Sequence, residues 1–452
     1  MNSWIKEAII YEIFPRVFSD EGNFQGIINR LSELKDLGVN TLWLMPVQKI
    51  GKVNRKGTLG SPYAIADHYF INSDLGDENS FRRLVETSHK NNFRLILDWV
   101  AMYTAWDHPW IKQHPDWYRK NEQGEIISVP NTDWYDIAHL NYGNPELHEA
   151  MIHSMSYWLK KFDIDGFRCD TAGNMYGLKP IIFWQKAIAQ LKKIKPEILM
   201  LAEWEDAEFH KNAFDLTYSW KLYHLLRKMK ENEKNLQGLT SVESVQITPQ
   251  ISSRHLSADY SQIKGTGFIH ELLELQKQEF CEGALRLRII ENHDEQRAMA
   301  TFGKDAVRAY ATLIFTLDGV PLLYNGQEIG ETERPSHFEP FKINWQSGDK
   351  KLRDFYKKLI KIRCENPVLY SGCAKKIQTD RDEYIYAFSK EYREHLAVIV
   401  INFSPGPVTA NLKLPMDGKW QDLLSNGIVK LSSRQLIADY LTPYASHIFV
   451  KK

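Results

Sequence analysis

The segment DIDGFRCDTAG, residues 163–173, has the composition of a buried β-strand that ends in charged side chains. Successive side chains of a strand point to opposite faces of the sheet. Phe167 and Cys169 therefore share an apolar face, whereas Arg168 and Asp170 share a charged one. An Arg–Asp pair on a half-buried face is either a structural ion pair or part of a reactive site, and this segment alone leaves both open.

Seven other apolar runs have the length of a strand, and longer amphipathic stretches separate most of them. With IDGFRCD (164–170), the predicted strands are AIIYEIF (8–14), VNTLWLMP (39–46), FRLILDWV (93–100), ILMLAEW (198–204), AFDLTYSW (213–220), LRIIEN (287–292) and GVPLLYN (319–325). Alternating strands and helices indicate an α/β fold with parallel strands and crossover helices. Eight such units predict a closed (β/α)8 barrel. An open doubly wound sheet is the alternative, but no GxGxxG loop follows the first strand.

Helical spacing marks several of the connecting segments. Apolar residues recur at helical intervals from Phe24 to Leu37, and Gly38 is expected to end that helix. Asn144 and Pro145 provide a cap and a first-turn residue for another helix. Further helices are expected around residues 81–85, 219–230 and 268–280.

Three regions depart from the alternation. Residues 103–143 are rich in Trp, Pro, Gly and Asn, and residues 221–286 hold two helical stretches around a polar segment rich in Ser and Gln. From about Cys373, short strand-like runs alternate with turn residues. We therefore predict a barrel over residues 1–102 and 144–372, a small inserted domain over 103–143, and an all-β sandwich over 373–452.

Composition excludes some functions. The chain has 452 residues with 57 Lys and Arg against 57 Asp and Glu, so it lacks the basic excess expected of a nucleic-acid-binding protein. No run approaches the roughly 18 apolar residues of a membrane span. The first residues, MNSWIKEAIIYEIFP, lack the features of a secretory leader, which favours a cytoplasmic location. The sequence indicates no oligomeric state.

Polar residues gather where the predicted strands end. Active sites of such barrels lie at the C-terminal ends of the strands, and those positions carry Asp98, Arg168, Asp170, Glu203, Asn292, His293 and Asp294. Two carboxyl groups across a glycosidic bond can cleave it, one as proton donor and the other as nucleophile. Arg168 would keep Asp170 ionised, and burial after the run ILMLA would raise the pKa of Glu203. Only one histidine is expected in this mouth, which argues against a metal centre.

At these motifs the sequence resembles the α-amylase family of glycoside hydrolases, glycoside hydrolase family 13. The matching stretches are GSPYAIADHYF (60–70), LILDWV (95–100), GFRCDTAG (166–173), LAEW (201–204), IIENHDEQR (289–297) and GVPLLYNGQE (319–328). The likeness covers nearly the whole chain. It implies a retaining, double-displacement mechanism on α-glucosidic bonds, in which Asp170 matches the nucleophile, Glu203 the acid/base and Asp294 the third carboxylate.

The resemblance also implies a substrate-binding set. Arg168 and His293 match residues that flank the reacting sugar, and Tyr63 matches an aromatic residue that stacks under it. Asp98 and Asn292 belong to the same motifs, and Tyr103 stands where the family has a histidine that contacts the sugar. These positions predict an α-glucan or maltooligosaccharide as the substrate, with no nucleic acid or membrane partner.

One segment departs from the family pattern. In LDWVAMYTAWDHPW (97–110), Met102 and Tyr103 replace the usual Asn-His pair. The asparagine is often a calcium ligand in the family, and a thioether does not suit a hard cation that prefers oxygen. We therefore expect no cofactor and no calcium at Met102. Tyr103 either packs without a functional role or alters activity and linkage preference.

Two other functions stay open. A 4-α-glucanotransferase would use the same machinery with a sugar hydroxyl in place of water, and a non-catalytic sugar-binding protein would keep only the fold. Four tryptophans of the inserted segment are candidate stacking platforms for sugar, although each could equally be a packing residue: Trp106, Trp110, Trp117 and Trp134.

Overall fold

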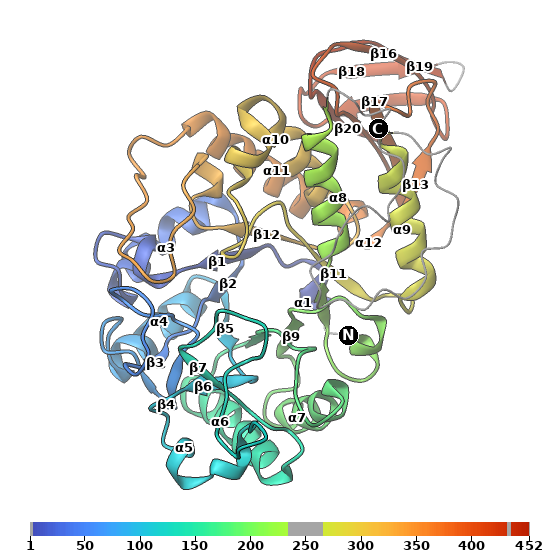
Figure 1. Cartoon of the computed structure of the whole chain (residues 1–452). Coiled ribbons are helices and arrows are strands. Elements are labelled where there is room, and N and C mark those ends of the chain that lie inside the picture. Colours follow the sequence, from blue (N-terminus) through green and yellow to red (C-terminus); the bar gives the residue numbers. More distant parts are fainter. Residues whose placement is uncertain (1–2, 234–264, 432–434, 452) are drawn as a thin grey trace.

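The computed structural model describes residues 3–233, 265–431 and 435–451; most of the predicted Ser- and Gln-rich segment lies outside these ranges. Eight parallel strands close into a barrel (Figure 1). They are β1 (Ile10–Ile13), β2 (Thr41–Leu44), β5 (Arg94–Trp99), β8 (Gly166–Cys169), β9 (Leu199–Ala202), β10 (Leu216–Tyr218), β11 (Leu285–Arg288) and β12 (Val320–Tyr324). The closed order β1-β2-β5-β8-β9-β10-β11-β12 follows the chain and returns to β1, so the predicted barrel is confirmed and the open sheet excluded.

The seventh strand is displaced from its predicted position. LRIIEN (287–292) was expected to form it, but β11 covers Leu285–Arg288. Its ladder with β12 ends where Arg288 pairs with Pro321, a residue without a backbone N–H. Ile289 and Ile290 are buried beyond the end of the strand, so their apolar character reflects burial and not strand pairing.

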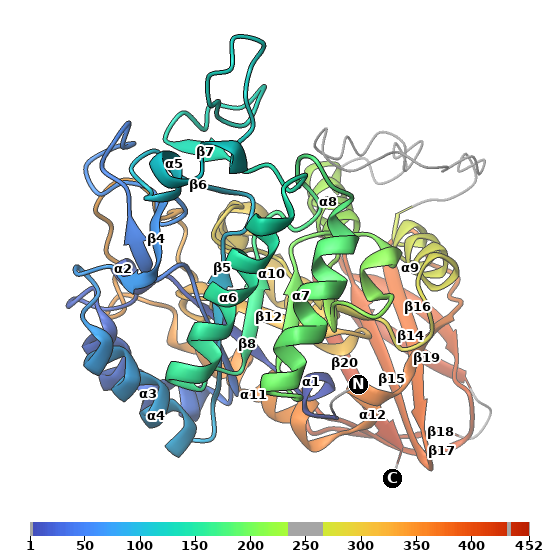
Figure 2. The ribbon, with the colours of Figure 1, turned by 90° about the horizontal axis from the view of Figure 1, so that it is seen from below.

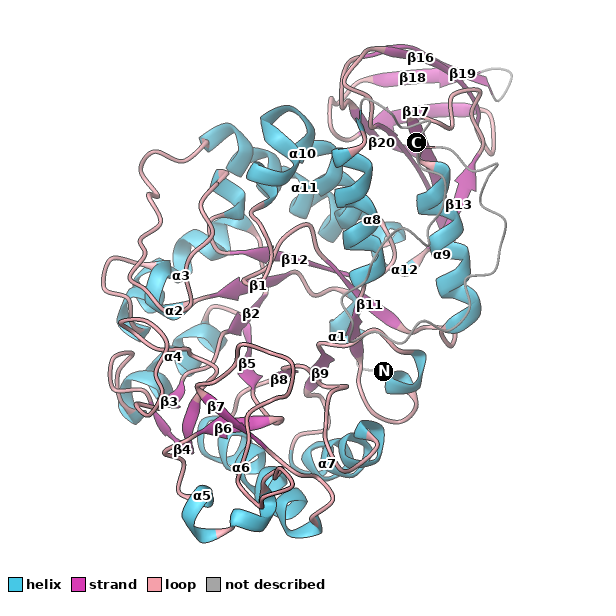
Figure 3. Ribbon diagram, in the orientation of Figure 1, coloured by secondary structure: helices cyan, strands magenta, loops and turns pink. Residues whose placement is uncertain are grey.

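Helices surround the barrel on the outside (Figure 3). The long ones are α3 (Phe24–Leu37), α4 (Glu78–Lys90), α6 (Pro145–Phe162), α7 (Pro180–Ile194), α8 (Trp220–Glu231), α9 (Gly267–Glu279), α10 (Ala298–Thr316) and α11 (Lys350–Glu365). Short helical turns are α1 (Ser3–Lys6), α2 (Pro15–Phe18), α5 (Trp110–Gln113), α12 (Val368–Ser371), η1 (Pro115–Trp117), η2 (Ala207–His210) and η5 (Gln327–Ile329). No helix in the described ranges is long and apolar enough to cross a membrane.

The helix ends follow the predicted capping chemistry. The side chain of Asn144 accepts a hydrogen bond from the N–H of Glu146, with Pro145 in the first turn of α6. Gly38 ends α3 with φ 99°, a left-handed conformation that suits glycine. The start of α6 and the end of α3 therefore lie where the sequence indicated.

The side chains of residues 167–169 point to alternate faces of the sheet, as the sequence predicted. Phe167 and Cys169 face the helices in the large core, whereas Arg168 lies inside the barrel. Apolar residues such as Ile10, Trp43 and Leu201 fill much of the barrel interior. A buried charge in such surroundings is costly unless it is paired, and the partners of Arg168 build the site described below.

Two small ladders lie outside the barrel sheet, and Figure 2 shows one of them, β6 with β7, beyond the end of the barrel. β3 (Gln48–Ile50) pairs with β4 (Ile65–Ile71) between β2 and α4. β6 (Tyr103–Ala105) pairs with β7 (Ile137–His139) within the excursion after β5. The two ladders place Tyr63 and Tyr103 near the carboxyl ends of the barrel strands.

The C-terminal part is all β. One sheet has the order β13-β14-β15-β20-β17-β18 and a second pairs β16 with β19. An apolar cluster that includes Val398, Leu412 and Trp420 packs between them. The strands are β13 (Cys373–Ile377), β14 (Ile385–Tyr392), β15 (His395–Asn402), β16 (Val408–Lys413), β17 (Gly418–Asp422), β18 (Ile428–Leu431), β19 (Gln435–Leu441) and β20 (Ser446–Lys451).

Candidate active site

Arg168 is the centre of a buried charge network at the carboxyl end of the barrel. It stands opposite Asp98 in the β5–β8 ladder, and its Nη1 lies 2.9 Å from Asp98 Oδ1. The same Nη1 lies 3.0 Å from Asp170 Oδ1, and Nη2 lies 3.0 Å from Glu203 Oε1. Burial opposes the charged guanidinium, but Asp98 and Glu203 hold the pKa of Arg168 above its usual range. One cation therefore gathers three acids from three strands.

Asp170 follows directly after β8 and is held on both oxygens. Arg168 contacts Oδ1, whereas Oδ2 accepts hydrogen bonds from the hydroxyls of Tyr103 (2.8 Å) and Thr171 (3.1 Å). Its side chain is 7% exposed. These contacts fix the carboxylate while leaving a small part of it open to a ligand.

Glu203 follows β9 and reaches the same space. Its Oε2 accepts a hydrogen bond of 2.7 Å from the backbone N–H of Thr171, and its side chain is 11% exposed. Burial raises the pKa of Glu203 to about 8; Arg168 opposes this shift, and the charge of Asp170 adds to it. Glu203 is therefore suited to carry a proton at neutral pH.

The backbone at Thr171 is strained where it meets Glu203. Its φ is 41°, a left-handed value that is rare for a β-branched residue. Such conformations cost on the order of 1–3 kcal/mol and occur preferentially at functional sites. Here the strained turn points one N–H at Glu203 and the Thr171 hydroxyl at Asp170.

Asp294 lies on the loop after β11, beside His293. His293 Nε2 lies 3.1 Å from Asp294 Oδ2, and Nδ1 contacts Glu12. Burial disfavours the imidazolium, but Asp294 and Glu12 raise the pKa of His293 well above its usual range. Burial would likewise raise the pKa of Asp294, yet His293 lowers it far below the ordinary value. Asp294 is therefore a fixed anion, in contrast to Glu203.

Tyr63 links the buried charges around Arg168 to the pair formed by His293 and Asp294. Its hydroxyl donates to Asp98 Oδ2 (3.0 Å) and lies 2.6 Å from His293 Nε2, with its ring stacked on the imidazole at 5.5 Å. Burial raises the pKa of Asp98 to about 6, although Arg168 opposes that shift. Tyr63 thus bridges an acid beneath the site and the histidine beside Asp294.

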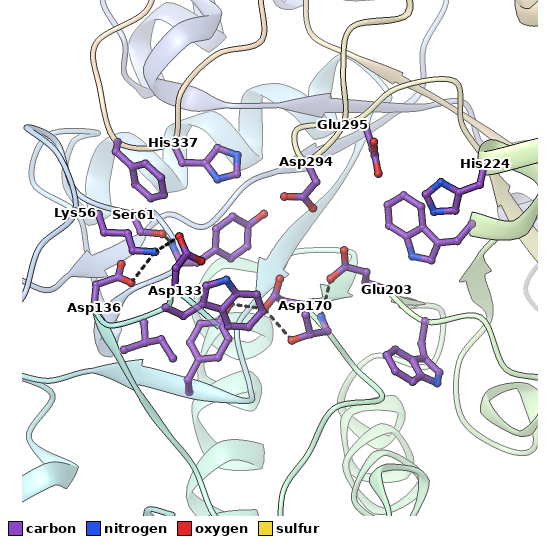
Figure 4. A pocket seen from close by; sticks show the side chains of 18 residues that line it. Lys56, Ser61, Asp133, Asp136, Asp170, Glu203, His224, Asp294, Glu295 and His337 are labelled. Carbon is purple, nitrogen blue, oxygen red and sulfur yellow. Dashed lines mark hydrogen bonds and ion pairs between the residues drawn. The ribbon is translucent and has the colours of Figure 1, made fainter. Parts of the chain in front are cut away.

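Several of these side chains line a cavity of about 400 Å³ (Figure 4). Of the residues predicted from the sequence, Tyr63, Tyr103, Asp170, Glu203 and Asp294 line it. The other four do not line its wall and are almost completely buried: Asp98, Arg168, Asn292 and His293. Their contacts here are with protein groups, so in this structure they hold the wall in place.

Asn292 shows this positioning role clearly. Its Oδ1 accepts hydrogen bonds of 3.1 Å from the N–H groups of Asp294 and Glu295, which shapes the loop that carries Asp294. The side chain has no exposed surface.

The cavity also contains residues that the sequence analysis missed. They are Lys56, Ser61, Asp133, Asp136, Ile137, Thr171, Trp204, Trp220, His224, Glu295, His337 and Phe338. Most come from long connections without readable periodicity, where sequence offers no signal. Trp204 and Glu295 each adjoin a predicted catalytic acid, and that adjacency was the available clue.

The expectation of a single histidine is wrong. The ring of His337 lies 5.5 Å from that of His293, and His293, Asp294 and His337 together offer three metal-type ligand atoms within 4.8 Å of one another. However, both ring nitrogens of His293 already contact protein groups, and its raised pKa favours the imidazolium, which cannot bind a cation. Burial and the charge of His293 lower the pKa of His337 to about 4. The donor set therefore does not fit a metal ion.

Met102 does not fit calcium either. It is buried in an apolar cluster with Val100 and Ala105, and its sulfur accepts a hydrogen bond from the Thr171 hydroxyl at 3.7 Å. A thioether in apolar surroundings provides none of the oxygen ligands that calcium requires.

Among the candidate stacking tryptophans, only Trp134 lines the cavity. Trp110 and Trp117 pack edge to face at 5.1 Å in the core, and the Trp106 indole donates a hydrogen bond to the Tyr135 carbonyl. Trp134 packs on the ring of Tyr103 at 5.7 Å.

A closed barrel with three acidic side chains at its C-terminal mouth defines a class of barrel enzymes that act through carboxyl groups. Family models agree. The model described as "Alpha amylase, catalytic domain" matches residues 12–137 and 131–367, and "Alpha amylase, C-terminal all-beta domain" matches residues 377–435. The chain belongs to the α-amylase family of glycoside hydrolases.

Individual relatives extend this assignment. "Alpha-amylase MalA" of Haloarcula japonica is 28% identical over 439 residues, which cover 94% of this chain but only 59% of MalA. "Alpha-amylase 3" of Dictyoglomus thermophilum is 26% identical, covering 98% of this chain and 93% of its own. The crystal structure of a "noncanonic maltogenic alpha-amylase AmyB" from Thermotoga neapolitana superposes with a TM-score of 0.84 at 27% identity, covering 100% of this chain and 99% of that one.

Proposed function

We propose that this protein hydrolyses α-glucosidic bonds in α-glucans or maltooligosaccharides with retention of configuration. Its relatives that carry amylase names support the substrate class. The observation that carries the proposal is the guanidinium of Arg168, which holds Asp170 and Glu203 at 3.0 Å each. Two carboxyl groups gathered this closely, one fixed and one with a raised pKa, match the requirements of a retaining glycosidase.

In the first step, an oxygen of Asp170 forms a bond to the anomeric carbon while the glycosidic C–O bond breaks. Glu203 donates its proton to the departing oxygen, so the leaving sugar gains a hydroxyl and Glu203 becomes a carboxylate. The contacts of Asp170 with Arg168 and Tyr103 hold the attacking group in one orientation.

In the second step, Glu203 takes a proton from water and the resulting hydroxyl attacks the same carbon. The bond to Asp170 breaks and the free carboxylate returns to its contacts with Arg168 and Tyr103. Asp294, a fixed anion at the cavity wall, would accept hydrogen bonds from sugar hydroxyls and favour the positively charged transition state.

Covalent trapping tests this proposal. An activated fluoroglucosyl fluoride should add one fluoroglucosyl group to the peptide that contains Asp170, as read by mass spectrometry. Asp170→Asn should take up no label, whereas Glu203→Gln should still be labelled because fluoride leaves without protonation. Absence of both labelling and turnover of maltooligosaccharides would show that the protein is a non-catalytic homologue.

Product analysis tests whether water or a sugar hydroxyl accepts the glucosyl group in the second step. With maltotriose, a hydrolase gives glucose and maltose, and each cleavage yields one new reducing end. Longer oligosaccharides without a matching increase in reducing ends would instead identify a glucanotransferase.

A further inference from the structure

One side of the catalytic cavity is closed by a charged cluster, which we call the Lys56 wall: Lys56, Asp133, Asp136 and Phe338. Lys56 Nζ lies 3.4 Å from Asp133 Oδ2 and 3.8 Å from Asp136 Oδ1. The ammonium also lies 5.5 Å from the ring centre of Phe338. All four residues line the same cavity as Asp170.

Two members of the Lys56 wall, Lys56 and Asp136, are buried, whereas the side chain of Asp133 is 88% exposed and Phe338 is partly buried. Lys56 and Asp136 are 8% and 4% exposed, respectively, and burial raises the pKa of Asp136 although Lys56 opposes this. Lysine and aspartate are rarely buried unless they are paired. The two contacts of the ammonium with carboxylates are long for an ion pair, so donors and acceptors remain for a ligand.

Hydrogen bonds from backbone N–H groups join the loop that carries Lys56 to the loop that carries Phe338. The N–H of Leu59 donates to the carbonyl of Phe338 at 2.8 Å, and the N–H of Thr58 donates to Glu339 Oε1 at 3.1 Å. Gly57 has φ 58°, and a Cβ there would lie 2.7 Å from Phe338 Cβ. Since these two loops touch this closely, the parts of the wall that carry Lys56 and Phe338 are fixed relative to each other.

The roles proposed for Asp170 and Glu203 indicate which end of a bound substrate faces the Lys56 wall. The proton donor faces the departing part of the substrate, so the reducing-end side of the cut bond lies toward Glu203. Glu203 and His224 lie on one side of Asp170, whereas Lys56, Asp133 and Asp136 lie on the other (Figure 4). The wall therefore faces the non-reducing side of the sugar that reacts.

We propose that the Lys56 wall closes the cavity directly behind the reacting glucosyl unit, so that the enzyme removes single glucose units from non-reducing chain ends. Lys56 donates hydrogen bonds to the terminal hydroxyls and Asp136 accepts them. A cavity of about 400 Å³ is near the lower end of the usual range for small-molecule sites, which suits a short segment of chain. This inference rests on the proposed function.

The test compares a free 4-nitrophenyl maltoheptaoside with the same compound carrying a 4,6-O-ethylidene group on its non-reducing glucose. Products are separated by chromatography at early times. We expect glucose as the first product of the free substrate and at least a hundredfold slower cleavage of the blocked one. Internal cleavage of both at similar rates, or maltose as first product, would overturn the inference while leaving the hydrolase intact. Failure to cleave either compound, without covalent labelling of Asp170, would instead refute the proposed function.

A substitution of Lys56 tests whether the Lys56 wall causes the discrimination against the blocked substrate. Lys56→Met keeps the length of the side chain but removes its charge and donors, and should lessen the discrimination against the blocked substrate by at least tenfold. Lys52→Met is the matched control, because Lys52 lies on the same loop, is exposed and does not line the cavity. Unchanged discrimination in Lys56→Met, with unchanged thermal unfolding, would overturn the assignment to Lys56.

Discussion

The hydroxyl of Tyr103 donates a 2.8 Å hydrogen bond to Oδ2 of Asp170. Arg168 holds the other oxygen of the same carboxylate. Tyr103 occupies the position where the family resemblance places a histidine, so this chain contacts its proposed nucleophile through a residue of different chemistry. The phenol stays protonated because burial raises its pKa well above the ordinary value, and Asp170 adds to this shift.

We predict that Tyr103→Phe lowers kcat/KM. A hydrogen bond to a charged group contributes about 1.5–3 kcal/mol, which corresponds to a roughly ten- to hundredfold loss. The loss should be larger for the second step, where Asp170 leaves as a carboxylate, so the covalent intermediate should accumulate in rapid-quench mass spectrometry. Tyr176→Phe is the control, because Tyr176 is 40% exposed and does not line the cavity. Equal rates for Tyr103→Phe and the wild type would assign Tyr103 to packing alone.

The dependence of kcat/KM on pH should reveal the protonation of Glu203. The acid must carry its proton in the free enzyme, so kcat/KM should be steady below the pKa of about 8 and fall as the pH rises above it. Glu203→Gln should lose this alkaline limb and about two to four orders of magnitude of turnover on maltooligosaccharides. Glucosyl fluoride needs no proton and should still form the covalent intermediate. An alkaline limb that persists in Glu203→Gln, and is also present in the control Glu208→Gln, would belong to another group.

The barrel could be predicted from sequence because local pattern and global fold agree. Apolar runs of strand length such as residues 39–46 and 93–100 recur between helical segments, and caps such as Asn144 mark helix ends. That Asp170, Glu203 and Asp294 line one cavity could be predicted, because each follows a strand directly or within a few residues. The position of β11 was missed, since Arg286 and Arg288 resemble surface residues yet are buried.

The Lys56 wall could not be predicted in the same way. Lys56, Asp136 and Phe338 come from three connections that share no periodicity, and hydrogen bonds between residues 58–59 and 338–339 bring two of those connections together. Contacts of this kind depend on tertiary structure. Likewise, the sequence placed Arg168 beside Asp170 but gave no indication that Glu203 contacts the same guanidinium.

Arg168 should also dominate the stability of the site. Arg168→Met leaves Asp98, Asp170 and Glu203 buried without their cation, and loss of one partner from a buried ion pair costs about 3–5 kcal/mol. The unpaired acids would bind protons more strongly in the folded than in the unfolded state, so the loss of unfolding free energy should grow as the pH rises from 5 to 8. Urea unfolding at several pH values measures this.

A surface arginine provides the control for that experiment. Arg381 is 54% exposed and lies 3.7 Å from Glu383, so Arg381→Met should change the unfolding free energy by less than about 1 kcal/mol. If Arg168→Met were no more destabilising than Arg381→Met, or if its effect did not depend on pH, the network around Arg168 would not be the ionic site described.

Stability and activity should not depend on calcium at the Met102 position. Met102 is 1% exposed and packs among apolar side chains, so we expect the same thermal midpoint and the same turnover after dialysis against a chelator and after addition of millimolar Ca²⁺. Met102→Asn should lower the thermal midpoint equally in both conditions, because it places an amide among apolar side chains. Met102→Leu, which conserves volume, should cost less than about 1.5 kcal/mol. A rise in the midpoint of the wild type on adding Ca²⁺ would contradict the expectation, and recovery of Met102→Asn by Ca²⁺ alone would show that the surrounding backbone still forms a cation site that lacks only the oxygen ligand.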